Sequence, residues 1–354
     1  MPIGGGEVAE LVVQQSFPDP RPTTNPYLIM LRDAIAAQSD VELRTFTWRR
    51  ALLARYDVFH VHWPEILVSG HSPLKKLVRQ ALTLGLVLKL RITRTPIVRT
   101  AHNLDLPSGI SRREVWLLRL IDRWTTLRIR LNPLTPVPDG SAVETIEHGH
   151  YRDWFAPYPR RTAIPGRLAY VGLVRRYKGV DALIAAFRDA FRAPEAPAAT
   201  LTVSGRPSSD ELAGQLQEEA RGDDRIFLRF AFLTDEELVA AVTESELIVL
   251  PYREMHNSGG ALSSLSLDRP VLVPDNDVNR LLAREVGETW VQRYDPPLRP
   301  EHLEQALAAV RGREPGDRPD LDARSWDETG RRHVAAYRRA IELRRGRRGR
   351  TRPA

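Results

Sequence analysis

The sequence predicts an α/β protein that contains two parallel sheets. Apolar, strand-like segments alternate with segments of helical period along most of the chain, and this alternation is typical of parallel sheets. The chain has 354 residues, which is long enough for two domains, and the stretch 151–167 carries three prolines and no clear period. We therefore expect two Rossmann-like domains of comparable size that face each other across an interdomain cleft.

The expected elements form an α/β series in each half. In the first half, strands are expected at 10–17, 41–46, 58–64 and 96–103, and helices at 27–38 and 114–129. In the second half, strands are expected at 167–172, 199–205, 225–232, 246–252 and 270–275, and helices at 179–192, 209–221, 234–245 and 260–267. Helices at 301–311 and 326–345 close the chain.

These elements divide the chain into four parts. We expect an N-terminal domain at 1–160, a C-terminal domain at 161–325, a closing helix at 326–345 that can return to the N-terminal domain, and a basic disordered tail at 346–354.

The net charge of +7 belongs to the end of the chain. Residues 331–354 contain ten arginines and one glutamate, and the remaining residues carry 42 basic and 44 acidic groups. Two interpretations of this end stay open, a solvated tail and a segment that binds an anionic membrane surface. A nucleic-acid partner is not expected, because basic and aromatic residues do not interleave anywhere in the chain.

Composition also narrows the compartment and the chemistry. The chain has no cysteine, which excludes disulfides and thiolate metal sites. It has no signal-like start and no apolar run of about 18 residues. We expect a cytoplasmic protein, with peripheral attachment at the inner face of the membrane as an extension of that prediction. The segment 72–94 combines six basic residues with an apolar stripe, so it fits either such a surface or a crossover helix that runs into a buried strand.

Cationic and glycine-rich segments follow the expected strands of the second half. Arg175 and Lys178 follow the first of these strands, Arg206 follows the next, and Gly259 and Gly260 open a helix. Ligands bind beyond the carboxyl ends of the strands in open α/β sheets, and a helix N-terminus attracts anions. A guanidinium and an ammonium that face amide-rich glycines suit a diphosphate.

Polar side chains follow the expected strands of the first half. His102 and Asn103 come after one strand, His62 and Trp63 after another, and His148 lies near the domain boundary. An imidazole at the end of a strand can transfer a proton or bind an acceptor hydroxyl. No pair of ligands at helical spacing predicts a metal site.

Several stretches resemble the GT-B glycosyltransferases. The stretch "GRLAYVGLVRRYKGVDALIAAF" resembles the start of the C-terminal domain in those enzymes, and "ELIVLPYRE" followed by "SGGALSSLSLDRPVLVP" resembles its later part. "RTPIVRTAHNL" and "IEHGHYRDWF" resemble the N-terminal half. The resemblance covers about residues 10–330 and is strongest to the bacterial retaining family four and its exopolysaccharide relatives, which include β-mannosyltransferases.

The resemblance implies roles for individual residues. Arg175 and Lys178 would bind the donor phosphates, Glu254 would lie near the donor sugar, and the segment with Phe232 would lie by the base. The second glutamate of the retaining pattern is replaced by Leu262, so the stereochemical outcome stays open. The catalytic candidates are His102, Arg175, Lys178 and Glu254. The donor-binding candidates are Gly172, Arg175, Lys178, Gly205, Arg206, Phe232, Tyr252, Ser258, Gly259 and Gly260. The acceptor-binding candidates are Asn25, His62, Trp63, Asn103 and His148.

The sequence thus predicts a glycosyltransferase that moves a sugar from a GDP- or UDP-sugar to a hydroxyl of a glycan, glycolipid or small-molecule acceptor. No cofactor is expected, because amide groups and cations can stabilise the leaving diphosphate without a metal. Two alternatives stay open, a non-catalytic nucleotide-sugar-binding protein and a sugar-nucleotide epimerase of the same superfamily.

Overall fold

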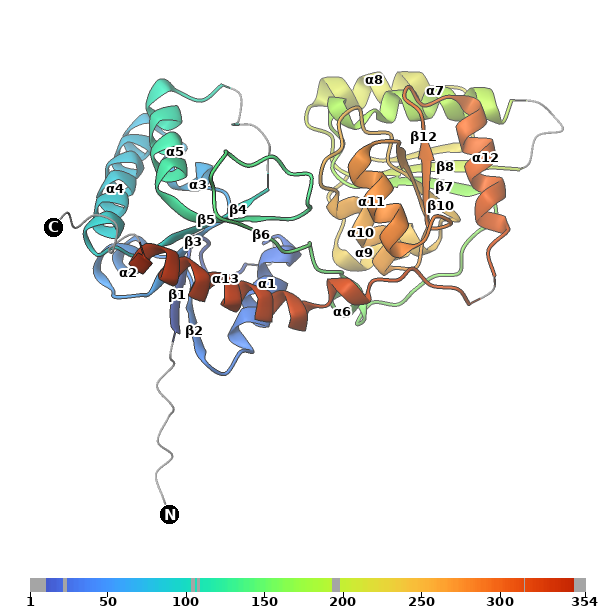
Figure 1. The fold of residues 1–354 in the computed structure, drawn as a ribbon. Coiled ribbons are helices and arrows are strands. Elements are labelled where there is room, and N and C mark those ends of the chain that lie inside the picture. Colours follow the sequence, from blue (N-terminus) through green and yellow to red (C-terminus); the bar gives the residue numbers. More distant parts are fainter. Residues whose placement is uncertain are drawn as a thin grey trace, which may run out of the picture. The chain divides into compact units, whose positions relative to one another are not determined.

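The computed structural model describes residues 11–21, 24–102, 106, 109–192, 198–314 and 316–346. These residues form two compact units (Figure 1). The first unit contains the described residues up to Gly149 together with those from Arg324 onward, and the second unit runs from His150 to Ala323.

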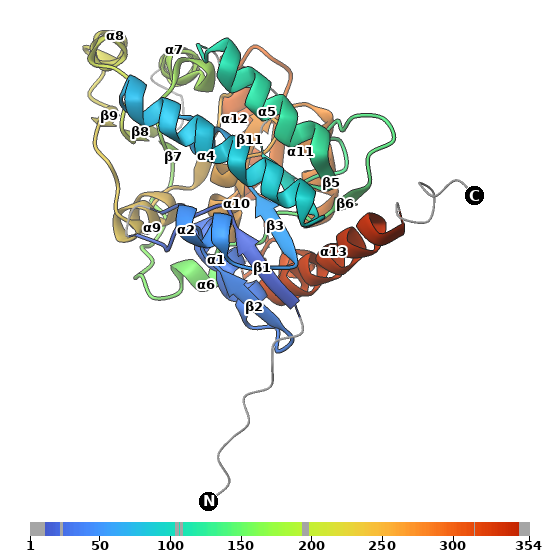
Figure 2. The ribbon, with the colours of Figure 1, turned by 90° about the vertical axis from the view of Figure 1, so that its left-hand side faces the viewer.

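The first unit is built on a six-stranded parallel sheet. Its strand order is β2 (Val41–Arg44), β1 (Leu11–Gln15), β3 (Val58–Val61), β4 (Ile97–Ala101), β5 (Thr125–Arg130) and β6 (Val143–Thr145). The helices α1 (Pro26–Ala36) and α13 (Trp326–Gly346) lie on one side of the sheet, and α4 (Pro73–Ile92) and α5 (Arg112–Trp124) lie on the other (Figures 1 and 2). The short helix α2 (Trp48–Leu53) lies between β2 and β3, α3 (Glu65–Val68) lies between β3 and α4, and both pack on α4.

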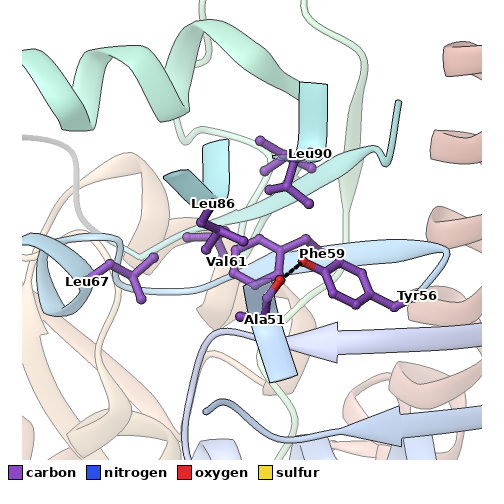
Figure 3. Packing of buried hydrophobic residues seen from close by; sticks show 8 residues of the cluster. Ala51, Tyr56, Phe59, Val61, Leu67, Leu86 and Leu90 are labelled. Atoms are coloured by element: carbon purple, nitrogen blue, oxygen red, sulfur yellow. Dashed lines mark hydrogen bonds between the residues drawn. The ribbon is translucent and has the colours of Figure 1, made fainter. Parts of the chain in front are cut away.

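The hydrophobic core on the α4 side joins this helix to the sheet. Leu86 and Leu90 of α4 pack on Phe59 and Val61 of β3, and Ala51 of α2 completes the contact (Figure 3). The buried Tyr56 hydroxyl donates a hydrogen bond of 2.7 Å to the Ala51 carbonyl oxygen, so the polar group in this core has a partner. This core fixes the position of β3, whose carboxyl end carries His62.

The helix α13 packs closely on α1 from the far end of the chain. A Cβ atom at Gly330 would lie 2.3 Å from the Ala34 carbonyl oxygen, so only glycine permits this approach of the two helices. His333 and Tyr337 of α13 are buried against the sheet. The end of the chain therefore contributes to the interior of the first unit.

The second unit repeats the doubly wound arrangement. Its parallel sheet has the order β12 (Val291–Tyr294), β11 (Val271–Pro274), β10 (Leu247–Val249), β7 (Arg167–Val171), β8 (Thr200–Ser204) and β9 (Ile226–Arg229). The helices α7 (Val180–Ala190), α8 (Asp210–Ala220) and α12 (Pro300–Arg311) lie on one side (Figure 1). On the other side lie α9 (Asp235–Thr243), α10 (Gly259–Ser266) and α11 (Asp277–Val286), and α6 (Arg152–Phe155) precedes the first strand of the unit.

Three sequence-based expectations differ from the observed elements. The helix expected over 114–129 ends at Trp124, and β5 begins at Thr125, because the β-branched run Thr125, Thr126 and Ile129 fits a buried strand better than a helix. The segment 72–94 contains no strand, since α4 continues to Ile92 and β4 begins only at Ile97.

The third difference concerns the boundary between the two parts. Residues 150–160, assigned above to the N-terminal part, belong to the second unit. The Tyr151 backbone amide donates to the Ser266 hydroxyl, and the Trp154 indole donates to Asp235. The chain therefore enters the second unit at His150, before the prolines of this stretch.

Candidate functional site

The candidate donor site lies where the strand order of the second sheet reverses. The chain goes from β7 to β8 on one side and returns to β10 on the other, so β7 and β10 are neighbours that lead to opposite halves of the sheet. Such a switch point leaves a crevice beyond the carboxyl ends of the two strands. The loop 172–179 follows β7 and the loop 250–258 follows β10, so both loops begin at this crevice.

Four of the predicted donor residues meet at this point. The Lys178 ammonium lies 3.1 Å from the Tyr252 hydroxyl oxygen and 4.7 Å from the centre of its ring. The Ser258 side chain hydrogen-bonds to Tyr252, and a Cβ atom at Gly260 would lie 3.3 Å from the same hydroxyl. The ammonium group therefore lies close to the first turn of α10.

The start of α10 is organised to present backbone amides. Ser258 is the N-cap, and its hydroxyl accepts a hydrogen bond of 3.1 Å from the Ala261 amide. Gly259 and Gly260 are the first two residues of the helix, where amide groups have no partner within the helix. The absence of side chains at these two positions lets an anion approach the amides and the positive end of the helix dipole.

Lys178 and Arg175 supply the positive charge of this site. Burial and the nearby Arg175 guanidinium lower the pKa of Lys178 to about 8. Within the described ranges neither side chain forms an ion pair with a carboxylate, whereas the neighbouring Arg176 pairs with Glu211 and Arg253 pairs with Asp181. Two cations that lack a counterion can be neutralised by a bound diphosphate.

Gly179 brings the Lys178 loop against the β10 loop. Its φ of +65° is in the left-handed region, and a Cβ atom there would lie 2.1 Å from the Pro251 carbonyl oxygen. The Arg253 amide donates to the Tyr177 carbonyl oxygen at 2.8 Å and ties the same two loops together. The contact between Lys178 and Tyr252 therefore depends on glycine at 179.

The first unit contains a connected set of polar side chains at its own switch point, where β1 lies beside β3. His62 Nδ1 lies 3.2 Å from His102 Nε2, and His62 Nε2 lies 3.2 Å from Gln15 Oε1. Gln15 Nε2 donates to the Tyr337 hydroxyl, which lies 2.7 Å from His60 Nδ1. The set therefore joins β1, β3, β4 and α13.

These hydrogen bonds determine the tautomer of His102. Burial lowers the pKa of His62 well below its usual range and that of His102 to about 3, so both rings are neutral near pH 7. His62 Nε2 must carry a hydrogen to donate to the Gln15 oxygen, which leaves Nδ1 of His62 as an acceptor. His102 then donates from Nε2, and its Nδ1 atom keeps a lone pair.

A pocket of about 240 Å³ adjoins His102 within the first unit. The indole of Trp63 stacks on the His102 ring with 4.0 Å between ring centres and 17° between planes. Arg99 and Arg128 line the pocket, and both pair with Asp122 at 2.5 and 2.9 Å. The pocket lining thus combines aromatic residues with polar and charged groups, as small-molecule sites commonly do.

Comparison with known proteins shows which family this arrangement represents. A GDP-mannose:glycolipid 4-beta-D-mannosyltransferase from Xanthomonas campestris pv. campestris is 41% identical over 331 residues, which cover 94% of this chain and 93% of that protein. The chain belongs to the GT-B glycosyltransferases. No protein-family model matches it.

Solved structures share the fold of this glycosyltransferase at low sequence identity. HepE from Anabaena in complex with UDP has a TM-score of 0.57 and 13% identity and covers 95% of this chain and 98% of its own. AviGT4, a glycosyltransferase involved in avilamycin A biosynthesis, has a TM-score of 0.56 and 14% identity, with coverage of 94% and 98%. The prediction of the GT-B fold is confirmed, as is the prediction of a glycosyltransferase.

The other predicted donor residues of the glycosyltransferase follow the carboxyl ends of β7, β8, β9 and β10. Glu254 and Arg206 are exposed in loops, and Phe232 is exposed beyond the end of β9. Gly172 and Gly205 lie directly after β7 and β8. Their roles stay predictions.

The remaining acceptor candidates belong to the first unit. The Asn25 side chain caps α1 by accepting a hydrogen bond of 3.0 Å from the Tyr27 amide. His148 contacts the Tyr27 ring at 4.6 Å between centres, and its Nδ1 atom lies 2.8 Å from the Gly149 carbonyl oxygen. Asn103 lies outside the described residues.

Sequence reasoning missed the residues that support His102. Gln15, His60 and Tyr337 lie within segments expected as strands or a helix, and nothing in their spacing marks them as partners. One signal was present in the sequence, because Gln14 and Gln15 are polar residues at the end of an otherwise apolar strand. Both side chains are fully buried in the structure, and a buried polar side chain needs a hydrogen-bond partner.

Across the described ranges, no three His, Asp or Glu side chains are grouped so that they could hold a metal ion. Among the helices of these same ranges, none is both long and apolar enough to cross a bilayer.

Proposed function

We propose that the enzyme transfers mannose from GDP-mannose to a hydroxyl group of a glycolipid and forms a β linkage. The observation that carries this proposal is the 41% identity, over nearly the whole chain, to a GDP-mannose:glycolipid 4-beta-D-mannosyltransferase. Such a product would be an intermediate in the assembly of a lipid-linked polysaccharide.

In the proposed reaction, the second unit binds the donor. The Arg175 guanidinium, the Lys178 ammonium and the amides of Gly259 and Gly260 hold the diphosphate. As the bond between the anomeric carbon and the phosphate oxygen breaks, negative charge grows on GDP, and these fixed donors stabilise it. The two cations support a reaction that needs no metal ion, so a chelator such as EDTA should leave the rate unchanged.

The first unit supplies the proposed acceptor site. From an α-linked donor, a β-linked product requires inversion, in which the acceptor oxygen attacks the anomeric carbon as GDP leaves. The proton of the attacking hydroxyl must then pass to a base. His102 fits this role because its hydrogen bond to His62 leaves Nδ1 with a lone pair, and Trp63 lines the same pocket.

A glycolipid acceptor is held in a membrane, so the enzyme would act at a membrane surface. The helix α4 supports this attachment. Leu74, Val78, Leu88 and Ile92 recur at helical spacing and form an exposed apolar stripe, in which Ile92 is 80% exposed. The helix carries five lysines and arginines and no acidic residue. An apolar stripe flanked by cations is typical of helices that lie in the membrane interface, and we place the enzyme at the inner face on this basis.

The donor is tested by thermal shift and product analysis. At 100 times its Kd, GDP should stabilise the enzyme by about 2.7 kcal/mol, and UDP at the same concentration should stabilise it less. Radiolabelled GDP-mannose incubated with bacterial membrane lipids should give a labelled glycolipid from which β-mannosidase, and not α-mannosidase, releases the label. Transfer from UDP-glucose without transfer from GDP-mannose would overturn the proposal.

A further inference from the structure

A second pocket of the first unit, of about 300 Å³, lies on the opposite edge of the sheet from His102. Asp57 and Pro96, which line it, directly precede β3 and β4, so the pocket lies beyond the amino ends of these strands. His62 and His102 follow the carboxyl ends of the same strands. A ligand in this pocket would therefore not be a reacting group.

The lining of the pocket is positively charged. Arg94, Arg344 and Arg345 contribute three guanidinium groups, and Asp57 is the only carboxylate among the lining residues. The Asp57 Oδ2 atom already accepts a hydrogen bond of 2.8 Å from the Val12 amide. Within the described part of the chain, Arg94 and Arg345 form no ion pair, whereas Arg344 has an interaction partner. The pocket therefore has an excess of cations that an anion can neutralise.

Arg94 occupies a backbone position that does not favour arginine. It directly follows the C-cap residue Thr93 of α4 and has a φ of +58°, in the left-handed region where glycine or asparagine is usual. The hydroxyls of Thr93 and Thr95 lie 2.9 Å apart beside it and also line the pocket. An unfavourable backbone conformation that persists at a pocket is a reason to look for a function of the side chain.

The surroundings of the pocket are apolar and exposed, which favours a lipid over a soluble anion. Ile92, two residues before Arg94, ends the exposed stripe of α4, and Leu53, three residues before the lining residue Tyr56, is 76% exposed. Figure 2 shows α4 along the outer side of the first unit. In the sequence, four more arginines follow Arg345.

We propose that this pocket binds the phosphate headgroup of an anionic membrane lipid. Arg94, Arg344 and Arg345 contact the phosphate, and Ile92 and Leu53 enter the acyl region. The bound headgroup fixes the orientation of the α4 stripe on the membrane. This proposal rests on the proposed attachment of the enzyme to a membrane and adds a specific site to it.

The test measures binding of the full chain to vesicles of phosphatidylcholine with and without 30% phosphatidylglycerol. Arg94→Asn removes one charge and suits the left-handed backbone, so its Tm should equal or exceed that of the wild type. Its affinity for the anionic vesicles should fall about fivefold, which is the effect of one basic group at an anionic surface. The double variant R344Q/R345Q removes two such groups and should lower the affinity about 25-fold. The matched control is R192Q/R221Q in the second unit, which removes two exposed arginines and should leave binding unchanged.

Each alternative outcome has a distinct meaning. If the pocket variants bind anionic vesicles as the control does, while Leu74→Gln with Val78→Gln abolishes binding, the headgroup site is wrong and membrane attachment stands. If the wild type binds neither kind of vesicle, both proposals fail. If millimolar inorganic phosphate raises the Tm of the wild type but not of R94N, and vesicle binding is the same in both, the ligand is free phosphate and the lipid proposal is overturned.

Discussion

Lys178 and Arg175 combine positive charge with the absence of a carboxylate partner in the described part of the chain, and both lie at the switch point of the second sheet. Their neighbour Arg176 differs in that it is exposed and pairs with Glu211 at 2.9 Å. These three basic residues lie within four positions of the sequence. Substituting each of them in turn therefore distinguishes a specific role in the candidate site from a general effect of positive charge.

We expect Arg175→Ala and Lys178→Ala each to lower kcat about 10²–10³-fold, because each removes a donor that stabilises the leaving diphosphate. Steady-state kinetics with GDP-mannose measures this, and the Tm should stay near that of the wild type. Arg176→Ala is the control and should retain nearly full activity. Near-normal turnover in both site variants would remove the two residues from the proposed mechanism.

The lowered pKa of Lys178 predicts a dependence on pH. With a pKa of about 8, the ammonium is charged below pH 8 and loses its proton as the pH rises above it. The value of kcat/KM for the donor should therefore fall on the alkaline side of about pH 8, since this ratio reports ionisations of the free enzyme. Lys178→Arg keeps the charge to above pH 12 and should abolish the alkaline decrease. A wild-type profile that is flat to pH 10 would contradict the pKa or the role.

The two loops of the candidate donor site are held together by backbone contacts, and these contacts depend on Gly179. Alanine there would meet both a positive φ and the Pro251 carbonyl oxygen, so Gly179→Ala should lower the free energy of unfolding by more than about 1 kcal/mol. The KM for the donor should rise in the same variant, because Lys178 moves with the loop.

Gly214 provides the matched control for this substitution. It lies inside α8, and a Cβ atom there would have no neighbour within 4 Å. Gly214→Ala should therefore stabilise the enzyme by about 0.5–1 kcal/mol and leave the donor KM unchanged. If thermal unfolding gives the same Tm change for both glycine variants, the close contact at 179 does not support the loop.

Within single elements, the sequence predicted most strands and the capped helices. Thr234 and Glu237 form a capping box at the start of α9, as the pattern Thr-x-x-Glu indicates. The boundary of α5 could not be found in this way, because Trp124 and the following threonines continue the apolar pattern without a glycine or proline. Burial within the sheet decides that Thr125–Arg130 is a strand.

The two units differ in the histidines of their interiors. His60, His62, His148 and His333 of the first unit lie in buried surroundings that lower their pKa values, to about 4 for His148 and His333. The described histidines of the second unit are only partly buried. Between the folded-state pKa and the usual value near 6.5, the unfolded chain binds protons that the folded first unit does not.

Lowering the pH from 7 to 5 should therefore destabilise the first unit more than the second. As the pH falls below about 6.5, each buried histidine lowers the free energy of unfolding by up to about 1.4 kcal/mol per pH unit. This dependence on pH disappears above about pH 7. Hydrogen exchange measured by mass spectrometry at both pH values, corrected for the intrinsic exchange rates, should show loss of protection in β1–β5 before β7–β11. Equal loss of protection in both sheets would contradict this expectation.

The sequence by itself determined the alternation of strands and helices, the two parallel sheets, and the place of the candidate donor-site side chains at the ends of strands in the second unit. These features are local, because a cation or a glycine that directly follows a strand is placed at the edge of the sheet by that strand alone. Only the tertiary structure decided the surroundings of His102. Gln15 and Tyr337 are 322 positions apart and meet because α13 covers the sheet next to α1. Hydrophobic period and composition predict which face of a helix or strand is buried. The element that covers this face comes from a distant part of the chain, and only the tertiary fold determines which one it is.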